Sequence, residues 1–105
     1  MNVHELHDRY SLAAHRLVAK KLLTDPGLLD VAKANLERIA AELPESSVAV
    51  LEWGIVLKCS VESISEFIVQ DNDHLQELRQ SSPFSGLISQ AERAALREAI
   101  YLRHL

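Results

Sequence analysis

The chain has 105 residues, of which 48% are hydrophobic and 25% charged, a composition typical of a folded domain rather than a disordered segment. This length predicts a single domain, residues 1–105, with no room for a second core. The formal charge of -4 has the wrong sign for a domain that holds nucleic acid by charge alone, so we expect a basic protein partner instead.

Two helices are expected at the amino-terminal end. Apolar residues at helical spacing predict a helix over about residues 3–23. Asp25 suits an N-cap and Pro26 the first position of a second helix, whose apolar stripe we expect to be buried. That stripe consists of Leu29, Ala32, Leu36, Ile39 and Leu43. Because the connection is short, the two helices are predicted to form an antiparallel hairpin.

The next run, residues 48–57, is apolar on nearly every face, which predicts a place in the middle of the fold. We expect a helix rather than a strand, because the sequence offers no second strand to satisfy the backbone groups of this run. Gly54 costs such a helix about 1 kcal/mol relative to alanine unless a neighbour packs closely there. The run could also form a two-fold interface, so a homodimer is an alternative role.

Three further helices are predicted in the second half. Ser60 can cap a short helix, and the run 71–73 can start another that presents Leu75 and Leu78. Residues 89–92 have the S-x-x-E form of a capping box and should begin a last helix, with Leu96 and Ile100 facing inward. The sequence therefore predicts an all-α, single-domain bundle of about five or six helices.

The sequence favours a cytoplasmic protein. Cys59 is the single cysteine, so no internal disulfide can form. The amino-terminal residues are polar and acidic where a signal peptide would be basic and then apolar. No apolar stretch approaches the roughly 20 residues of a membrane span.

Histidines near the amino terminus raise the possibility of a metal site. His4 and His7 lie at i, i+3 beside acidic residues, but no third ligand accompanies them in sequence. Structural zinc generally takes four ligands. We therefore expect neither a metal nor a cofactor.

Arg9 and His15 have the R-x-x-x-x-x-H spacing of helical HEPN-type ribonucleases. In such a site the histidine takes the proton of the ribose 2′-hydroxyl and the arginine stabilises the charged phosphorane. The pair keeps a ribonuclease open as an alternative function, although Tyr10 replaces the usual polar residue and the surrounding charge is not basic.

A helix-turn-helix is a second alternative, with residues 47–58 and 61–69 as its two helices. The second helix would then contact DNA through two acidic and two serine side chains. They are Glu62, Ser63, Ser65 and Glu66. These groups are poor probes of a phosphate-lined groove, so a DNA-binding regulator is not favoured.

The segment 78–86 separates two predicted helices, because Pro83 disfavours helical backbone at Ser82. Phe84 either fills the core or contacts a partner. We expect four polar residues of this segment to be exposed where a protein partner can bind them. They are Arg79, Gln80, Ser81 and Ser82.

The second half of the chain resembles a family of small bacterial proteins encoded beside abortive-infection-type nucleotidyltransferase toxins. The resemblance lies in Trp53, ISEFI at 64–68, Asp73, LRQSSPFSGLIS at 78–89, and Glu92 with Arg93. It implies an antitoxin that binds and blocks a toxin. From the residues themselves, we expect no catalysis and a partner-binding surface formed by Trp53, Asp71, Asp73, Arg79, Gln80, Ser81, Ser82 and Phe84.

Overall fold

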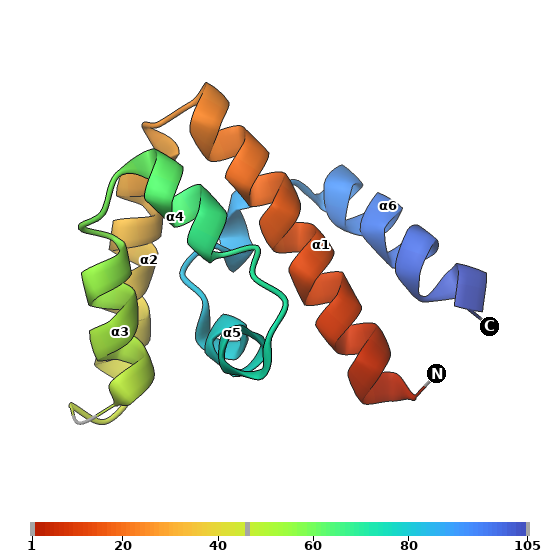
Figure 1. Cartoon of the computed structure of the whole chain (residues 1–105), viewed down its shortest axis with the longest axis horizontal. Coiled ribbons are helices and arrows are strands. Elements are labelled where there is room, and N and C mark those ends of the chain that lie inside the picture. Colours follow the sequence, from red (N-terminus) through yellow and green to blue (C-terminus); the bar gives the residue numbers. More distant parts are fainter. Residues whose placement is uncertain (1, 46, 105) are drawn as a thin grey trace.

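The structure is a computed structural model that describes residues 2–45 and 47–104, and within them it contains six α-helices, three short 3₁₀ helices and no strand (Figure 1). The elements are α1 (Val3–Thr24), α2 (Leu28–Glu42), α3 (Val48–Val56), α4 (Val61–Phe67), α5 (Asp73–Leu78), η1 (Arg79–Ser81), η2 (Ser85–Leu87), α6 (Gln90–Ile100) and η3 (Leu102–His104). The predicted all-α bundle is confirmed.

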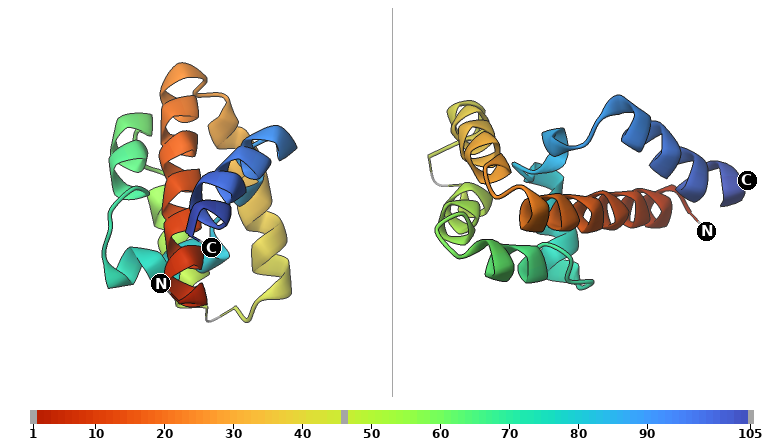
Figure 2. Two further views of the ribbon diagram at one scale, coloured as in Figure 1. Left: turned by 90° about the vertical axis from the view of Figure 1, so that its right-hand side faces the viewer. Right: turned by 90° about the horizontal axis from the view of Figure 1, so that it is seen from above.

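Helix α1 is the longest element, and it packs mainly against α4 and α6 (Figure 2). The side chain of Asn2 caps its first turn by accepting a hydrogen bond from the backbone N–H of Glu5 at 2.9 Å. At the other end, the N–H of Asp25 donates to the carbonyl of Lys21, and the Asp25 side chain accepts from the N–H of Gly27. Because Asp25 shapes this turn, α2 begins at Leu28, two residues later than the sequence predicts.

Helix α2 lies beside α1 and runs back along the molecule, which confirms the predicted hairpin (Figure 1). Its predicted stripe is less buried than expected, although Leu29 and Leu36 pack against the core cluster. Ala32 is the buried residue of the helix, whereas Leu29, Leu36 and Ile39 are half-buried and Leu43 is exposed. The reason is that α2 covers the edge of the bundle, where it contacts α3 and η2 on one side and solvent on the other.

The apolar run is a helix, α3, as predicted, but it lies at the edge of the molecule rather than in its middle (Figure 1). Trp53 and Val56 face the core, while Val48, Leu51 and Ile55 remain exposed. A bundle of this size has too few helices to cover every face of a helix at its edge. No atom of a neighbouring element lies within 4 Å of the position that a Cβ on Gly54 would take, so close packing does not explain this glycine.

The core is built around Trp53 and Phe84, whose rings meet edge to face with centroids 5.7 Å apart. Side chains from α1, α4 with its C-cap residue, and α5 belong to the same buried cluster. They include Val18, Leu22, Ile64, Ile68 and Leu75. None of the described helices is long and apolar enough to cross a membrane.

Helix α6 begins with the predicted capping box, in which Ser89 and Glu92 satisfy each other's backbone N–H groups. Lys21 of α1 forms an ion pair with Glu92, and this contact lowers the pKa of the Glu92 carboxyl. No residue of this helix is fully buried, but Leu96 packs against the core cluster and so faces inward as predicted; Leu96 and Ile100 are both half-buried. Helix α6 is therefore held along α1 by the Lys21–Glu92 ion pair and by half-buried side chains.

Candidate functional site

The segment 79–84, predicted to be an exposed partner loop, is largely part of the core. Arg79 is only 3% exposed, and Ser82 and Phe84 are buried. Gln80 is exposed and Ser81 is half-buried. The prediction of an exposed Arg79 and Ser82 is wrong because their polar groups find partners inside the protein, which sequence polarity does not reveal.

Arg79 holds the chain that follows α4. Its Nη1 donates to the carbonyl oxygens of Ile68 at 3.1 Å and Gln70 at 2.8 Å, where α4 ends. Burial lowers the pKa of Arg79, and the charges of Asp71 and Asp8 oppose this effect. The other two guanidinium nitrogens, Nε and Nη2, are buried without a hydrogen-bond partner among the described residues.

Ser82 belongs to a buried network with His15 of α1. The His15 ring contacts the carbonyl of Ser11 through Nδ1 and the hydroxyl of Ser82 through Nε2, both at 2.7 Å. A carbonyl can only accept, so Nδ1 carries the proton and Nε2 accepts from the serine hydroxyl. Burial is the main reason that the pKa of His15 falls from 6.5 to about 4, so the ring is neutral at pH 7. The Ser82 oxygen also accepts from the N–H of Phe84 at 3.1 Å.

Trp53 was predicted to contact a partner, but it is fully buried beneath α3. Its Nε1 donates to the carbonyl of Leu78 at 3.1 Å, and its ring packs against Phe84 and Phe67. Trp53 and Phe84, both predicted to contact a partner, are therefore core residues and are not available to a partner at the surface.

A groove lies between α3 and α5. It has a volume of about 290 Å³, and its lining includes Val48, Glu52, His74 and Glu77. His74 and Glu52 lie 2.6 Å apart across it, which links the two helices. Asp71 and Asp73, both predicted contact residues, are exposed in the turn before α5 and at its first residue.

The outer face of α3 carries three exposed apolar side chains, Val48, Leu51 and Ile55. We call these three residues, together with Glu52 and Glu77, the α3–α5 surface. This surface does not follow from the sequence pattern, which predicts an interior place for the whole run 48–57. The sequence did contain a signal for this surface, because the run 48–57 is apolar on nearly every face. A helix at the edge of a bundle buries only one of its faces, so the apolar side chains on its other face remain exposed.

The two residues of the ribonuclease alternative do not share a surface. Arg9 is exposed, whereas His15 is 2% exposed with both ring nitrogens engaged. A spacing of six residues places the two side chains on different sides of α1. This geometry gives no support to a joint action on a phosphodiester.

Helices α3 and α4 occupy the positions predicted for a helix-turn-helix. Ser60 caps α4 as expected by accepting from the N–H of Ser63 at 3.1 Å. Glu62, Ser63 and Glu66 are exposed, but Ser65 is buried and its hydroxyl donates to the carbonyl of Ala19. The accessible residues of α4 are thus acidic or small, as the sequence indicated.

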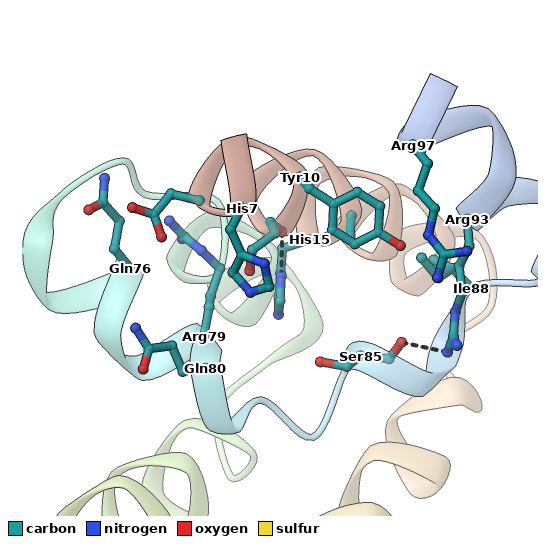
Figure 3. Close-up of a pocket in the computed structure, with 13 residues that line it drawn as sticks. His7, Tyr10, His15, Gln76, Arg79, Gln80, Ser85, Ile88, Arg93 and Arg97 are labelled. Atoms are coloured by element: carbon teal, nitrogen blue, oxygen red, sulfur yellow. Dashed lines mark hydrogen bonds between the residues drawn. The ribbon is translucent and has the colours of Figure 1, made fainter. Parts of the chain in front are cut away.

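A second pocket, of about 280 Å³, lies between α1, η1 and α6 (Figure 3). Arg79 lies on one side of it, and Arg93 and Arg97 lie on the other, with His7 and Tyr10 of α1 between them. We call it the arginine pocket. The sequence does not predict this pocket, although the i, i+4 spacing of Arg93 and Arg97 places two cations on one face of α6.

Among the described residues, no three His, Cys, Asp or Glu side chains gather as a metal site would require, and His4 and His7 are exposed. Comparison with known proteins adds no further assignment. The chain matches no protein family, no curated protein and no solved structure.

Proposed function

We propose that this chain is a small protein-binding module, the antitoxin of a bacterial toxin–antitoxin pair, which neutralises a nucleotidyltransferase-like toxin in the cytoplasm by direct contact. The observation that carries the proposal is the outer face of α3. Val48, Leu51 and Ile55 are 73%, 60% and 67% exposed, and they form a row at i, i+3 and i+7. A row of large apolar side chains that faces solvent is typical of a protein interface.

The α3–α5 surface is held rigidly from below, because the opposite face of α3 is anchored by Trp53. A preformed helix face loses little conformational entropy on binding. Covering three such side chains contributes roughly 1.5 to 3 kcal/mol for each, before the costs of association. This surface therefore supplies the apolar centre that a stable complex needs.

The charge around the apolar row favours a basic partner. Glu52 and Glu77 line the groove, and Asp73 is exposed at the start of α5. An enzyme that acts on nucleic acid or nucleotides has a basic active-site groove, so an acidic binder can cover it, and complementary charge speeds the encounter. The resemblance of the second half of the chain to antitoxin-like proteins supports the same assignment. In this proposal Asp73 stays a contact residue, while Arg79, Ser82, Trp53 and Phe84 support the fold.

Growth rescue tests the proposal. The chain would be co-expressed, as wild type and as Leu51→Glu, with a nucleotidyltransferase-like toxin that an affinity pull-down of the tagged chain recovers from its native cells. We expect the wild type to relieve growth arrest and to co-purify with the toxin, and Leu51→Glu to do neither while keeping its helical circular dichroism. The matched control is Leu102→Glu, because Leu102 is 62% exposed in η3, at the opposite end of the molecule from α3 (Figure 1). Full rescue by Leu51→Glu would remove α3 from the interface.

A homodimer is the competing use of the same face. Light scattering at increasing protein concentration measures it directly. A dimer that Leu51→Glu dissociates, in a protein that neither binds the toxin nor relieves its growth arrest, would assign the α3–α5 surface to self-association and refute the antitoxin proposal.

A further inference from the structure

The groove between α3 and α5 has a carboxylate on each side. Glu52 of α3 and Glu77 of α5 both line it. His74 precedes Glu77 by three residues, so these two side chains share one face of α5. The Nε2 of His74 lies 2.6 Å from the Oε2 of Glu52, which means that this face is turned toward α3. Glu52 and Glu77 are therefore brought to the same space from two different helices.

Both carboxylates have acceptor oxygens to spare. His74 contacts the Oε2 of Glu52, and the other oxygen, Oε1, has no hydrogen-bond partner among the described residues. Glu77 is exposed, and its carboxylate forms no hydrogen bond or ion pair within residues 2–45 and 47–104. The described lining of the groove contains no lysine or arginine. A carboxylate accepts hydrogen bonds at two oxygens, so the groove can still pair with a cation that another molecule supplies.

The remaining lining of the groove is apolar. It consists of Val48, Ala49 and Leu78. Leu78 is buried and Ala49 half-buried, while Val48 is 73% exposed and also belongs to the apolar row on α3. The volume of about 290 Å³ is enough for one side chain and too small for a helix. The side chain that suits such a groove has an apolar stem and a cationic head.

We propose that the groove binds an arginine side chain of the partner that covers the apolar row. This inference rests on the proposed function and adds the chemical group by which the partner is recognised. The arginine stem packs against Val48 and Leu78, and the guanidinium donates to Oε1 of Glu52 and to the carboxylate of Glu77. A guanidinium has five N–H donors in a planar fork, whereas a lysine ammonium is a compact, strongly hydrated point charge, so two carboxylates on separate helices favour arginine.

Val48 joins the groove to the apolar row, so the arginine lies at the edge of the same interface. A charged pair that apolar contacts shield from water is stronger than one at an open surface, where solvent and salt screen it. The acidic groove also disfavours a partner that brings a carboxylate to this position. The apolar row therefore contributes affinity, and the groove contributes specificity.

Equilibrium binding of the toxin that the pull-down recovers tests the inference. Glu77→Gln keeps the size of the side chain and removes its charge, and the Glu77 carboxylate has no partner to lose among the described residues. We expect this variant to raise the Kd about ten-fold, the effect of losing one charge-assisted hydrogen bond. The matched control is Glu98→Gln, because Glu98 is exposed on α6, on the opposite side of the molecule from α3, and should leave the Kd unchanged (Figure 1).

Leu51→Glu separates the failure of this inference from the failure of the proposed function. If Leu51→Glu abolishes binding and Glu77→Gln binds as tightly as the wild type, the α3–α5 surface is the interface but its groove takes no arginine. If Leu51→Glu also binds fully, the proposed function itself fails. Equal weakening by Glu77→Gln and Glu98→Gln would overturn the inference as well, because binding would then follow overall charge.

A titration with a single blocked amino acid, followed by ¹⁵N correlation spectra, tests the groove without the toxin. Nα-acetyl-L-arginine methylamide should shift the amide resonances of the residues that line the groove until they saturate, and Glu77→Gln should weaken this effect. The citrulline analogue has nearly the same shape without the charge, so it should leave these resonances unmoved. Equal shifts with both compounds, or no shift at the groove with either, would overturn the assignment to arginine, as would a lysine analogue that binds as tightly.

Discussion

His15 should make the protein lose stability between pH 7.5 and pH 5. Its neutral ring joins α1 to Ser82 through one donated and one accepted hydrogen bond. Protonation places a charge in a site that is 2% exposed and turns the Nε2 acceptor into a donor, which then competes with the Ser82 hydroxyl proton. The folded state therefore resists protonation, and burial lowers the pKa of His15 to about 4.

The size of the effect follows from proton linkage. The pKa rises from about 4 in the folded protein to 6.5 in the unfolded chain, so the unfolded chain binds more protons between these values. The free energy of unfolding must then fall as the pH is lowered through this window. For one such group, the loss between pH 7.5 and pH 5.0 is about 2 kcal/mol, out of a limit of about 3 kcal/mol reached below pH 4.

Urea denaturation at pH 7.5 and pH 5.0, followed by circular dichroism, measures this loss. The lower value stays above the ordinary pKa of carboxyl groups, about 4, so most carboxylates remain ionised. His15→Gln is the control, because an amide can still accept from Ser82 but does not titrate. We expect this variant to be less stable than the wild type at pH 7.5 and to lack about 2 kcal/mol of the pH dependence. An identical pH dependence in both proteins would refute the reasoning.

Three stability measurements address other parts of the chain. Phe84→Ala should lower the free energy of unfolding by about 3 to 5 kcal/mol, because it leaves a cavity at the centre of the core. As a control, Gln80→Ala should change the free energy of unfolding by less than about 0.5 kcal/mol. Similar small effects of both substitutions would mean that residues 79–84 are not part of the core. Ser89→Ala should cost about 1 kcal/mol in thermal unfolding by removing the capping box of α6, and no loss would show that α6 does not unfold with the rest of the bundle. Gly54→Ala should stabilise the protein by about 0.4 to 1 kcal/mol, since the added Cβ meets no atom within 4 Å, and destabilisation would imply close packing at this face of α3.

Local chemistry in the sequence determined most of the secondary structure. The capping residues Ser60 and Ser89 start their helices where the sequence places them. The apolar run 48–57 could form only a helix in a chain without a second strand. These features depend on neighbours within a few residues, which is why the sequence suffices to predict them.

Burial depended on the tertiary structure. The run 79–84 is polar in sequence, but Arg79 and Ser82 are enclosed because the carbonyl of Ile68 and the ring of His15, distant in sequence, accept their hydrogen bonds. Helix α3 is apolar all round, but its place at the edge of the bundle leaves one face in solvent. Which polar groups find internal partners, and which face of a helix is covered, depends on contacts between segments that local pattern does not specify.

The same distinction holds for the candidate sites. The sequence by itself determined that the chain folds as an acidic helical domain, because composition and helix signals are local and additive. The exposed row on α3 and the three arginines that meet around one pocket arise only when α1, α3, η1 and α6 take their places in the fold. Arg79 and Arg97 lie on different elements, and their convergence is a property of packing that no spacing within the sequence encodes.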